Sequence, residues 1–125
     1  MADMNLVGEF LQEQLQILVQ LQSRLLDNSN SEMAENLRKL CYRSRCFFLF
    51  INESNLARFF EQCSNEIQFS CTQLLEWAEL IYQVLLTIRG NSLQIELAPF
   101  LERFSKLKSL ETVDERNFEN ENPRS

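Results

Sequence analysis

Histidine is absent from this sequence, and glycine and proline are scarce, with two of each among 125 residues. Without an imidazole, the chain cannot support Ser-His-Asp or Cys-His catalysis, the common zinc enzymes or a relay through phosphohistidine. Gly8 and Gly90 stand alone, so there is no glycine-rich phosphate loop. A many-stranded β-fold would lack its corners with so few turn-forming residues. The sequence therefore predicts an all-α fold.

Long apolar runs and an excess of basic residues are also missing. No run approaches the ~20 apolar residues that span a bilayer, and the N-terminus has no basic segment followed by an apolar one. The net charge of −6 disfavours nucleic acid or an anionic membrane as partner, because phosphates would be repelled. We therefore expect a cytoplasmic protein that binds neither nucleic acid nor membrane.

The four cysteines admit three interpretations: two disulfides, a zinc site or reduced thiols. They are Cys41, Cys46, Cys63 and Cys71, and no two of them form a CxxC pair. With no histidine and no secretory signal, we favour reduced thiols, each in an apolar helical context where cysteine acts as a small hydrophobe. We expect no metal and no cofactor.

The length and the apolar content of 45% suffice for one domain with a single core. Apolar spacing predicts helices over residues 4–26, 31–51, 55–69, 72–89 and 98–110. The first four are expected to form an antiparallel four-helix bundle, with the fifth as an accessory C-terminal helix. This divides the chain into a bundle domain at 1–110 and a disordered acidic and polar tail at 111–125.

Several local signals refine this assignment. Ser29 with Glu32, and Ser70 with Gln73, have the spacing of capping boxes that open the second and fourth helices. Residues 93–97 alternate, which predicts an extended or irregular lead-in to the fifth helix. Trp77 is expected to be a core or hinge anchor rather than a platform for a ligand. On the first helix, the glutamines at 12, 14, 16, 20 and 22 form either a coiled-coil seam or a solvated outer face, and we favour the solvated face.

The second helix carries two stripes at helical spacing. The buried stripe is predicted to comprise Met33, Leu37, Leu40, Cys41, Ser44, Phe48 and Ile51. The other stripe comprises Arg38, Tyr42, Arg45 and Leu49, and it should face solvent. Residues 47–51 are all apolar and cannot all point one way on a helix, so Leu49 or Phe50 should be partly exposed.

Residues 37–45, followed by Asn52, Leu56, Ala57 and Phe59, resemble the histidine-containing phosphotransfer (HPt) domains of chemotaxis-type histidine kinases. The resemblance covers residues 10–89 and implies an HPt-like bundle. An ungapped alignment puts Tyr42 at the phosphoacceptor histidine, Arg45 at the following lysine, and Cys46 and Asn52 at two glycines. The glutamate that bonds the imidazole in such domains falls on Ser64, and Glu61 lies one turn earlier.

The aligned positions imply that phosphotransfer is lost while binding is retained. A tyrosine is protonated at neutral pH and would give a stable ester, so a relay through it would load and unload slowly. Family members dock the acidic pocket of receiver domains through this face. Five of the twelve basic residues lie on the two central helices of this acidic chain, namely Arg38, Lys39, Arg43, Arg45 and Arg58. These residues are either part of a docking face or merely solvating charges.

The expected function is therefore that of a non-catalytic, pseudo-phosphotransfer protein. It would be a monomer in isolation and modulate two-component signalling by binding a response-regulator receiver domain or a histidine kinase. The expected partner-binding residues are Arg38, Tyr42, Arg45, Cys46, Leu49 and Arg58, with Tyr42 at the position of the lost phosphoacceptor. The alternative is a small helical adaptor, chaperone or assembly subunit that binds partner helices and dimerises through apolar surface, for which ten phenylalanines are the main argument.

An enzymatic function has little support in the sequence. Carboxylates at Glu61, Glu66, Glu76 and Glu79 fall on predicted helices and could pair. Nothing marks two of them as an acid and a base, and a solvated acidic face explains them better. We therefore expect no catalytic residues.

Overall fold

The computed structural model describes residues 4–24, 30–67, 73–91 and 93–121. Within these ranges the chain is all-helical and contains no strand. Its five helices are α1 (Met4–Ser23), α2 (Asn30–Phe50), α3 (Ser54–Glu66), α4 (Leu74–Asn91) and α5 (Ala98–Glu121). The all-α prediction is confirmed for the described residues.

The predicted helix positions agree with the structure to within a few residues, except at the end of α5. That helix begins at Ala98 as predicted but continues past Leu110 to Glu121, so its predicted end was wrong. Residues 111–121 contain neither glycine nor proline, and nothing in this stretch stops a helix. The division at residue 110 into a bundle domain and a tail stays a prediction. Both expected capping serines, Ser29 and Ser70, lie outside the described residues.

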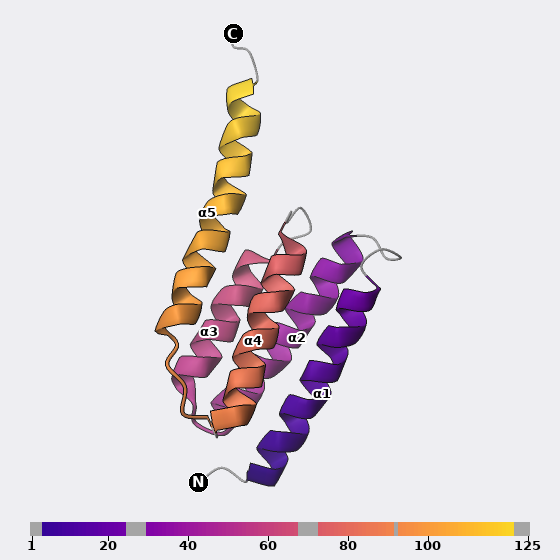
Figure 1. The fold of residues 1–125 in the computed structure, drawn as a ribbon, viewed down its shortest axis with the longest axis vertical. Helices are drawn as coiled ribbons and strands as arrows, with labels where there is room; N and C mark the ends of the chain where they lie inside the picture. Colours follow the sequence, from indigo (N-terminus) through magenta and orange to yellow (C-terminus); the bar gives the residue numbers. More distant parts are fainter. Residues whose placement is uncertain (1–3, 25–29, 68–72, 92, 122–125) are drawn as a thin grey trace.

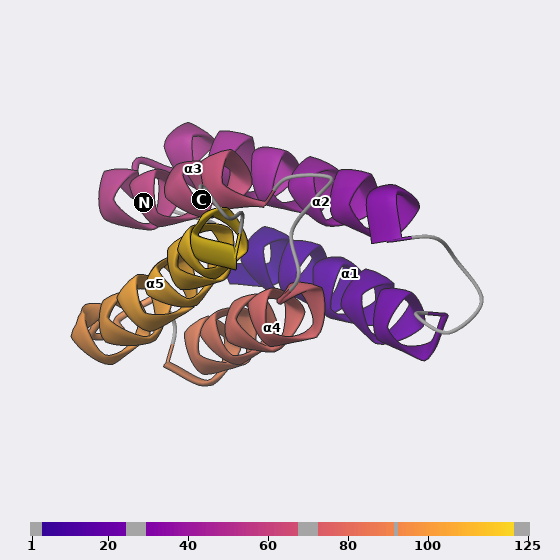
Figure 2. The ribbon, with the colours of Figure 1, turned by 90° about the horizontal axis from the view of Figure 1, so that it is seen from above.

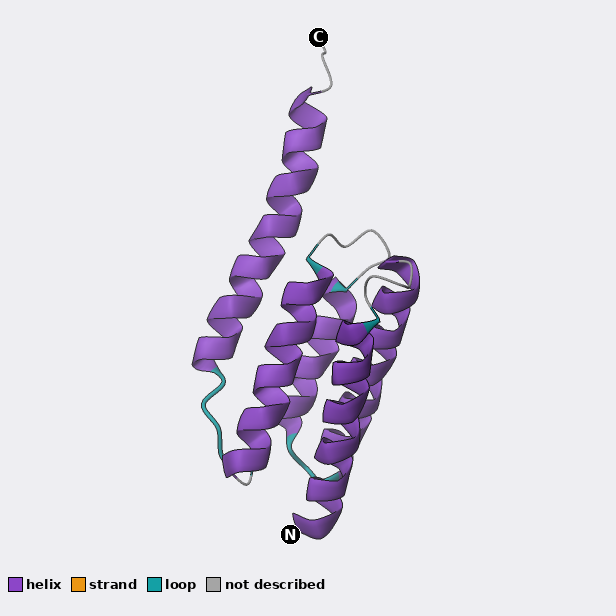
Figure 3. Cartoon of the chain, turned by 45° about the vertical axis from the view of Figure 1, so that its right-hand side comes forward, coloured by secondary structure: helices purple, strands orange, loops and turns teal. Residues whose placement is uncertain are grey.

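Successive helices run in opposite directions (Figure 1). Seen from above, α2 and α3 form one layer, and α1, α4 and α5 form the other (Figure 2). Within these layers α2 packs chiefly against α3 and α1 packs chiefly against α4, while α5 contacts α4 and α3. A non-helical stretch from Leu93 to Leu97 connects α4 to α5 (Figure 3), as the sequence predicts.

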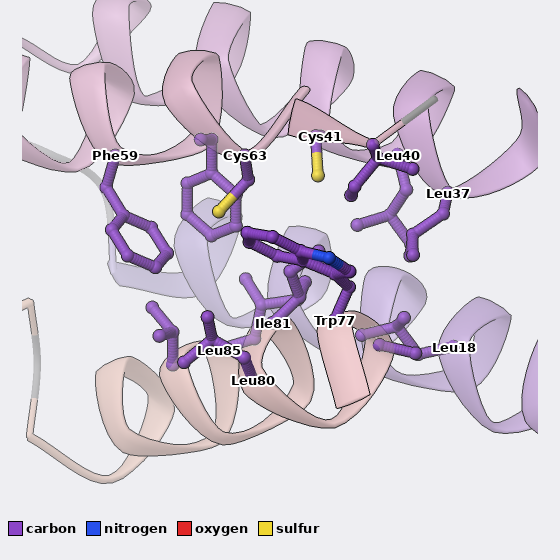
Figure 4. Close-up of a cluster of buried hydrophobic side chains, with 14 of the residues drawn as sticks. Leu18, Leu37, Leu40, Cys41, Phe59, Cys63, Trp77, Leu80, Ile81 and Leu85 are labelled. Carbon is purple, nitrogen blue, oxygen red and sulfur yellow. The ribbon is translucent and has the colours of Figure 1, made fainter. Parts of the chain in front are cut away.

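The core lies between the two layers and is mostly aliphatic and aromatic. Trp77 is fully buried on α4, with the sulfur atoms of Cys41 on α2 and Cys63 on α3 on the opposite side of the core (Figure 4). The ring of Phe104 on α5 meets the indole edge-on, with centroids 5.3 Å apart. Trp77 is therefore the core anchor that the sequence predicts, and it links α4 to α5.

The buried stripe of α2 is confirmed, since all its members are buried except Ile51, which is half-buried. The polar side of α1 differs from the prediction at one residue. Gln14 is fully buried, although its exposed neighbours Gln12 and Gln16 fit the expected solvated face. The Oε1 atom of Gln14 has no hydrogen-bond partner among the described residues, and its Nε2 donates to Glu13 Oε1 at 3.3 Å.

The end of α2 is set by a Schellman motif, in which two backbone amides after the helix satisfy its last carbonyls. Asn52 N–H donates to the carbonyl of Leu49 at 3.1 Å, and Glu53 N–H donates to that of Phe48 at 2.7 Å. Asn52 has a φ of 65°, in the left-handed region that glycine favours and asparagine tolerates. This tight turn directs α3 back along α2.

Candidate functional site

Tyr42 lies on the outer side of α2 with 59% of its surface exposed, as the second stripe predicts. Leu49, two turns further along, is also exposed, whereas Arg38 and Arg45 are half-buried. The arginines are half-buried because they sit at the edge where α3 packs against α2. We call this surface the α2–α3 face, comprising Arg38, Tyr42, Arg45, Cys46 and Leu49 on α2, and Arg58, Glu61 and Ser64 on α3.

At one end of this face is a hollow of about 460 Å³. We call it the basic hollow, and its lining residues are Glu35, Arg38, Lys39, Tyr42, Arg43 and Ser64. Arg38 and Tyr42 therefore share one concave site with Ser64 of the neighbouring helix. Three of the lining side chains are cationic and one is a carboxylate, so the hollow is positive in a chain of net charge −6.

Arg45 lies outside the hollow and has a partner within the chain. Its Nε lies 3.8 Å from Oε2 of Glu61 on α3, forming an ion pair between the two helices. This contact gives a carboxylate partner to one of the five basic residues that the sequence offers for a docking face. Since both groups are partly exposed, the pair contributes little to stability, about 1 kcal/mol or less.

The other end of the face is more apolar. Leu49 is 46% exposed and Phe50 is 74% exposed, which confirms the prediction for the run at residues 47–51. Arg58 is exposed on α3, one turn before Glu61. Because α2 and α3 are antiparallel and Arg45 pairs with Glu61, Arg58 lies at the end of the face that carries Leu49.

Cys46 is exposed, so the apolar context that the sequence indicates for all four cysteines was wrong for this residue, which is accessible as an expected partner-binding residue must be. Cys41 and Cys63 are free and buried, as expected, and Cys71 lies outside the described residues. Burial raises the pKa of both buried thiols; for Cys63, the nearby Cys41 and Glu66 raise it further. Within the described ranges, no three His, Cys, Asp or Glu side chains gather in a way that could hold a metal ion.

Three members of the site are not among the expected partner-binding residues. The sequence places Lys39 and Arg43 only in the basic group of the two central helices, and Glu61 one turn before the aligned Ser64. Lys39 and Arg43 line the hollow beside Tyr42, and Glu61 neutralises Arg45. Helical spacing could have indicated the first two, because Lys39 is three residues before Tyr42 and four before Arg43. The pairing of Glu61 depends on the register of α3 against α2, which local spacing does not specify.

A second hollow, of about 550 Å³, lies between α1 and α4. Its lining residues are Gln12, Leu15, Gln16, Val19, Gln20, Tyr82 and Arg89. Nη1 of Arg89 donates a hydrogen bond to Oε1 of Gln12 at 3.2 Å, so the one cation that lines this hollow is already engaged. The α2–α3 face is therefore the better candidate for recognising an anionic group.

No described helix combines the length and apolar character needed to cross a bilayer. Comparison of the chain with protein families, with curated proteins and with solved structures found no match.

Proposed function

We propose that this chain is a non-catalytic, HPt-like protein that modulates two-component signalling by docking a receiver domain or a histidine kinase on its α2–α3 face. The principal support is the position of Tyr42. It is exposed on α2 and lines a positive hollow together with Arg38 and Ser64. A partner's acidic surface could reach this hollow without any rearrangement of the core.

Two further features favour the resemblance. Ser64, aligned with the glutamate that bonds the imidazole in phosphotransfer domains, lines the same hollow as Tyr42. Asn52, aligned with a glycine, has the positive φ that glycine favours. In this proposal α1 to α4 form the antiparallel four-helix bundle of an HPt-like domain, and α5 is the accessory helix.

The lost chemistry follows from the side chain at position 42. A phenol is a poor phosphoacceptor at neutral pH, and its phosphate ester is far more stable than a phosphoramidate. The protein would therefore occupy a partner's docking surface without taking up or passing on the phosphoryl group. It would act in the cytoplasm as a monomer and compete with a functional phosphotransfer domain for the same partner.

A helical adaptor or assembly subunit is the second candidate, and the exposure of Phe50 favours it. A side chain of this size at 74% exposure, next to an exposed Leu49, is suited to apolar contact with a partner helix. In that case the apolar end of the α2–α3 face would carry the affinity, and the basic end would contribute little.

Binding measurements against the receiver domains and histidine kinases encoded in the same genome test the proposal. Arg38→Glu should weaken binding to the true partner by at least about tenfold, because it puts a carboxylate where an acidic surface docks. Arg24→Glu, an exposed charge reversal at the end of α1, is the matched control and should leave affinity unchanged. Affinity that is insensitive to Arg38→Glu but lost in Phe50→Ser would reject the docking model in favour of the adaptor.

A further inference from the structure

The described residues do not compensate all the charges around the basic hollow. Lys39 Nζ lies 3.2 Å from Oε2 of Glu35, so the lysine and the only carboxylate lining the hollow neutralise each other. Arg38 and Arg43 form no ion pair with any described residue. The hollow therefore holds two guanidinium groups without a counter-charge.

Arg38 shows a second sign of an incomplete site. Its Nε atom is buried and has no hydrogen-bond partner among the described residues. A buried N–H donor without an acceptor costs about 1–3 kcal/mol, so burial of this atom is unfavourable until an acceptor arrives. An oxyanion in the hollow would supply that acceptor once the guanidinium of Arg38 turns its Nε–H toward the hollow.

Guanidinium groups are suited to this kind of ligand. Their planar N–H donors match the oxygen atoms of carboxylate and phosphate in paired hydrogen bonds. The hydroxyl groups of Tyr42 and Ser64, which line the same hollow, can donate to further oxygens. The volume of about 460 Å³ leaves room for a tetrahedral group and the atoms that carry it.

The charge balance selects among the oxyanions. A single carboxylate would compensate only one of the two arginines, whereas a phosphate monoester carries about −1.5 to −2 at neutral pH. We propose that the basic hollow binds a phosphate monoester dianion, with Arg38 and Arg43 as its charged ligands. This inference does not depend on an HPt-like function, because it rests only on the contents of the hollow.

The monoester could belong to a free phosphorylated metabolite or to a phosphorylated side chain of a partner protein. The shared chemistry is the phosphate dianion, and the two sources differ in what surrounds it. A side chain would bring a peptide along the adjoining α2–α3 face, where Leu49 is exposed. A free metabolite would contact the hollow alone.

Titration of the full chain with inorganic phosphate, followed by NMR of the arginine Nε–Hε signals, tests the site directly. At constant ionic strength, phosphate and sulfate should shift the signals of Arg38 and Arg43 along a saturating curve, and acetate should not. Arg38→Gln and Arg43→Gln should each weaken phosphate binding by about tenfold, as expected for one charge-assisted contact.

Matched controls are available elsewhere on the surface. Arg103 is half-buried like Arg38, and Arg24 is exposed like Arg43, but neither residue lines the hollow. Arg103→Gln and Arg24→Gln should therefore leave phosphate binding unchanged. Equal, non-saturating shifts with all three anions would reduce the effect to charge screening and overturn the proposal. Phosphate binding that survives both hollow variants would overturn it as well.

A phosphoserine peptide and free O-phosphoserine then distinguish the sources. Tighter binding of the peptide supports a phosphorylated partner side chain, and equal affinity supports a free metabolite. Arg45→Glu separates this inference from the proposed function, because it alters the docking face outside the hollow. Loss of partner binding with intact phosphate binding is the result that both proposals expect. Partner binding that survives Arg45→Glu would overturn the docking face alone, and loss of phosphate binding would overturn the phosphate site alone.

Discussion

Cys46 lies at the surface, whereas Cys41 and Cys63 are buried in the core, and this contrast predicts their reactivity. The thiolate is the reactive species, and burial raises the pKa of both core thiols. At pH 8, iodoacetamide should alkylate Cys46 in the native protein but leave Cys41 and Cys63 intact until the chain unfolds. Peptide mass spectrometry assigns each site and separates the label on Cys71. Alkylation of Cys41 at the rate of Cys46 would contradict this burial.

The Oε1 atom of Gln14 is buried and has no hydrogen-bond partner among the described residues. Gln14→Met keeps the length of the side chain and removes the unsatisfied oxygen. The substitution should raise the free energy of unfolding by about 1 kcal/mol. Urea denaturation measures the change, with Gln16→Met on the exposed side of α1 as the control at no more than about 0.5 kcal/mol. A loss of stability in Gln14→Met would mean that the amide contributes contacts beyond its bond to Glu13.

Phe104 is a buried contact between α5 and the two helices on which it packs, α3 and α4. Its ring contacts Trp77 on α4 and lies 6.3 Å, centroid to centroid, from that of Phe59 on α3. Phe104→Ala should cost about 3 kcal/mol by leaving a cavity, and it should admit water to the indole. Because Trp77 is the only tryptophan, its fluorescence emission reports the change as a shift to longer wavelength.

The matched control for Phe104→Ala is Leu101→Ala on the same helix. Leu101 is 40% exposed, so its truncation should change stability by about 0.5 kcal/mol at most and leave the emission unchanged. An unshifted emission in Phe104→Ala would show that α5 does not shield the indole.

For the whole molecule, the distribution of apolar surface predicts a monomer. Among the residues whose exposure the structure describes, the large exposed apolar ones are Leu6, Val19, Tyr42, Leu49, Phe50, Leu75, Leu101 and Leu110. They are divided among four helices, with no more than three on any one helix, a distribution that is typical of a monomer surface. Sedimentation velocity should therefore give a single species with the mass of one chain. A dimer that Phe50→Ser dissociates would support the adaptor function instead.

The spacing of apolar residues predicted the features that depend on one helix alone. It correctly predicted the two stripes of α2, the exposure of Tyr42 and the burial of Trp77, because helical spacing alone fixes which residues share a face. It could not predict the ion pair between Arg45 and Glu61, since that contact depends on the register of two helices. The burial of Gln14 was not predicted, because a polar side chain is expected on the solvated side of a helix. The packing of α1 nevertheless places this side chain in the protein interior.

The pairing of the helices has a consequence for the order in which the chain folds. Only Ile51, Asn52 and Glu53 separate α2 from α3 in the sequence. In contrast, α1 packs against α4, and the whole of α2 and α3 lies between them in the sequence. Bringing α1 and α4 together closes the longer loop and loses more chain entropy before any stabilising contact forms. The hairpin of α2 and α3 should therefore form first. Pulsed hydrogen exchange during refolding should then protect amides of α2 and α3 ahead of those of α1. Simultaneous protection would instead indicate that neither half is stable until the two layers meet.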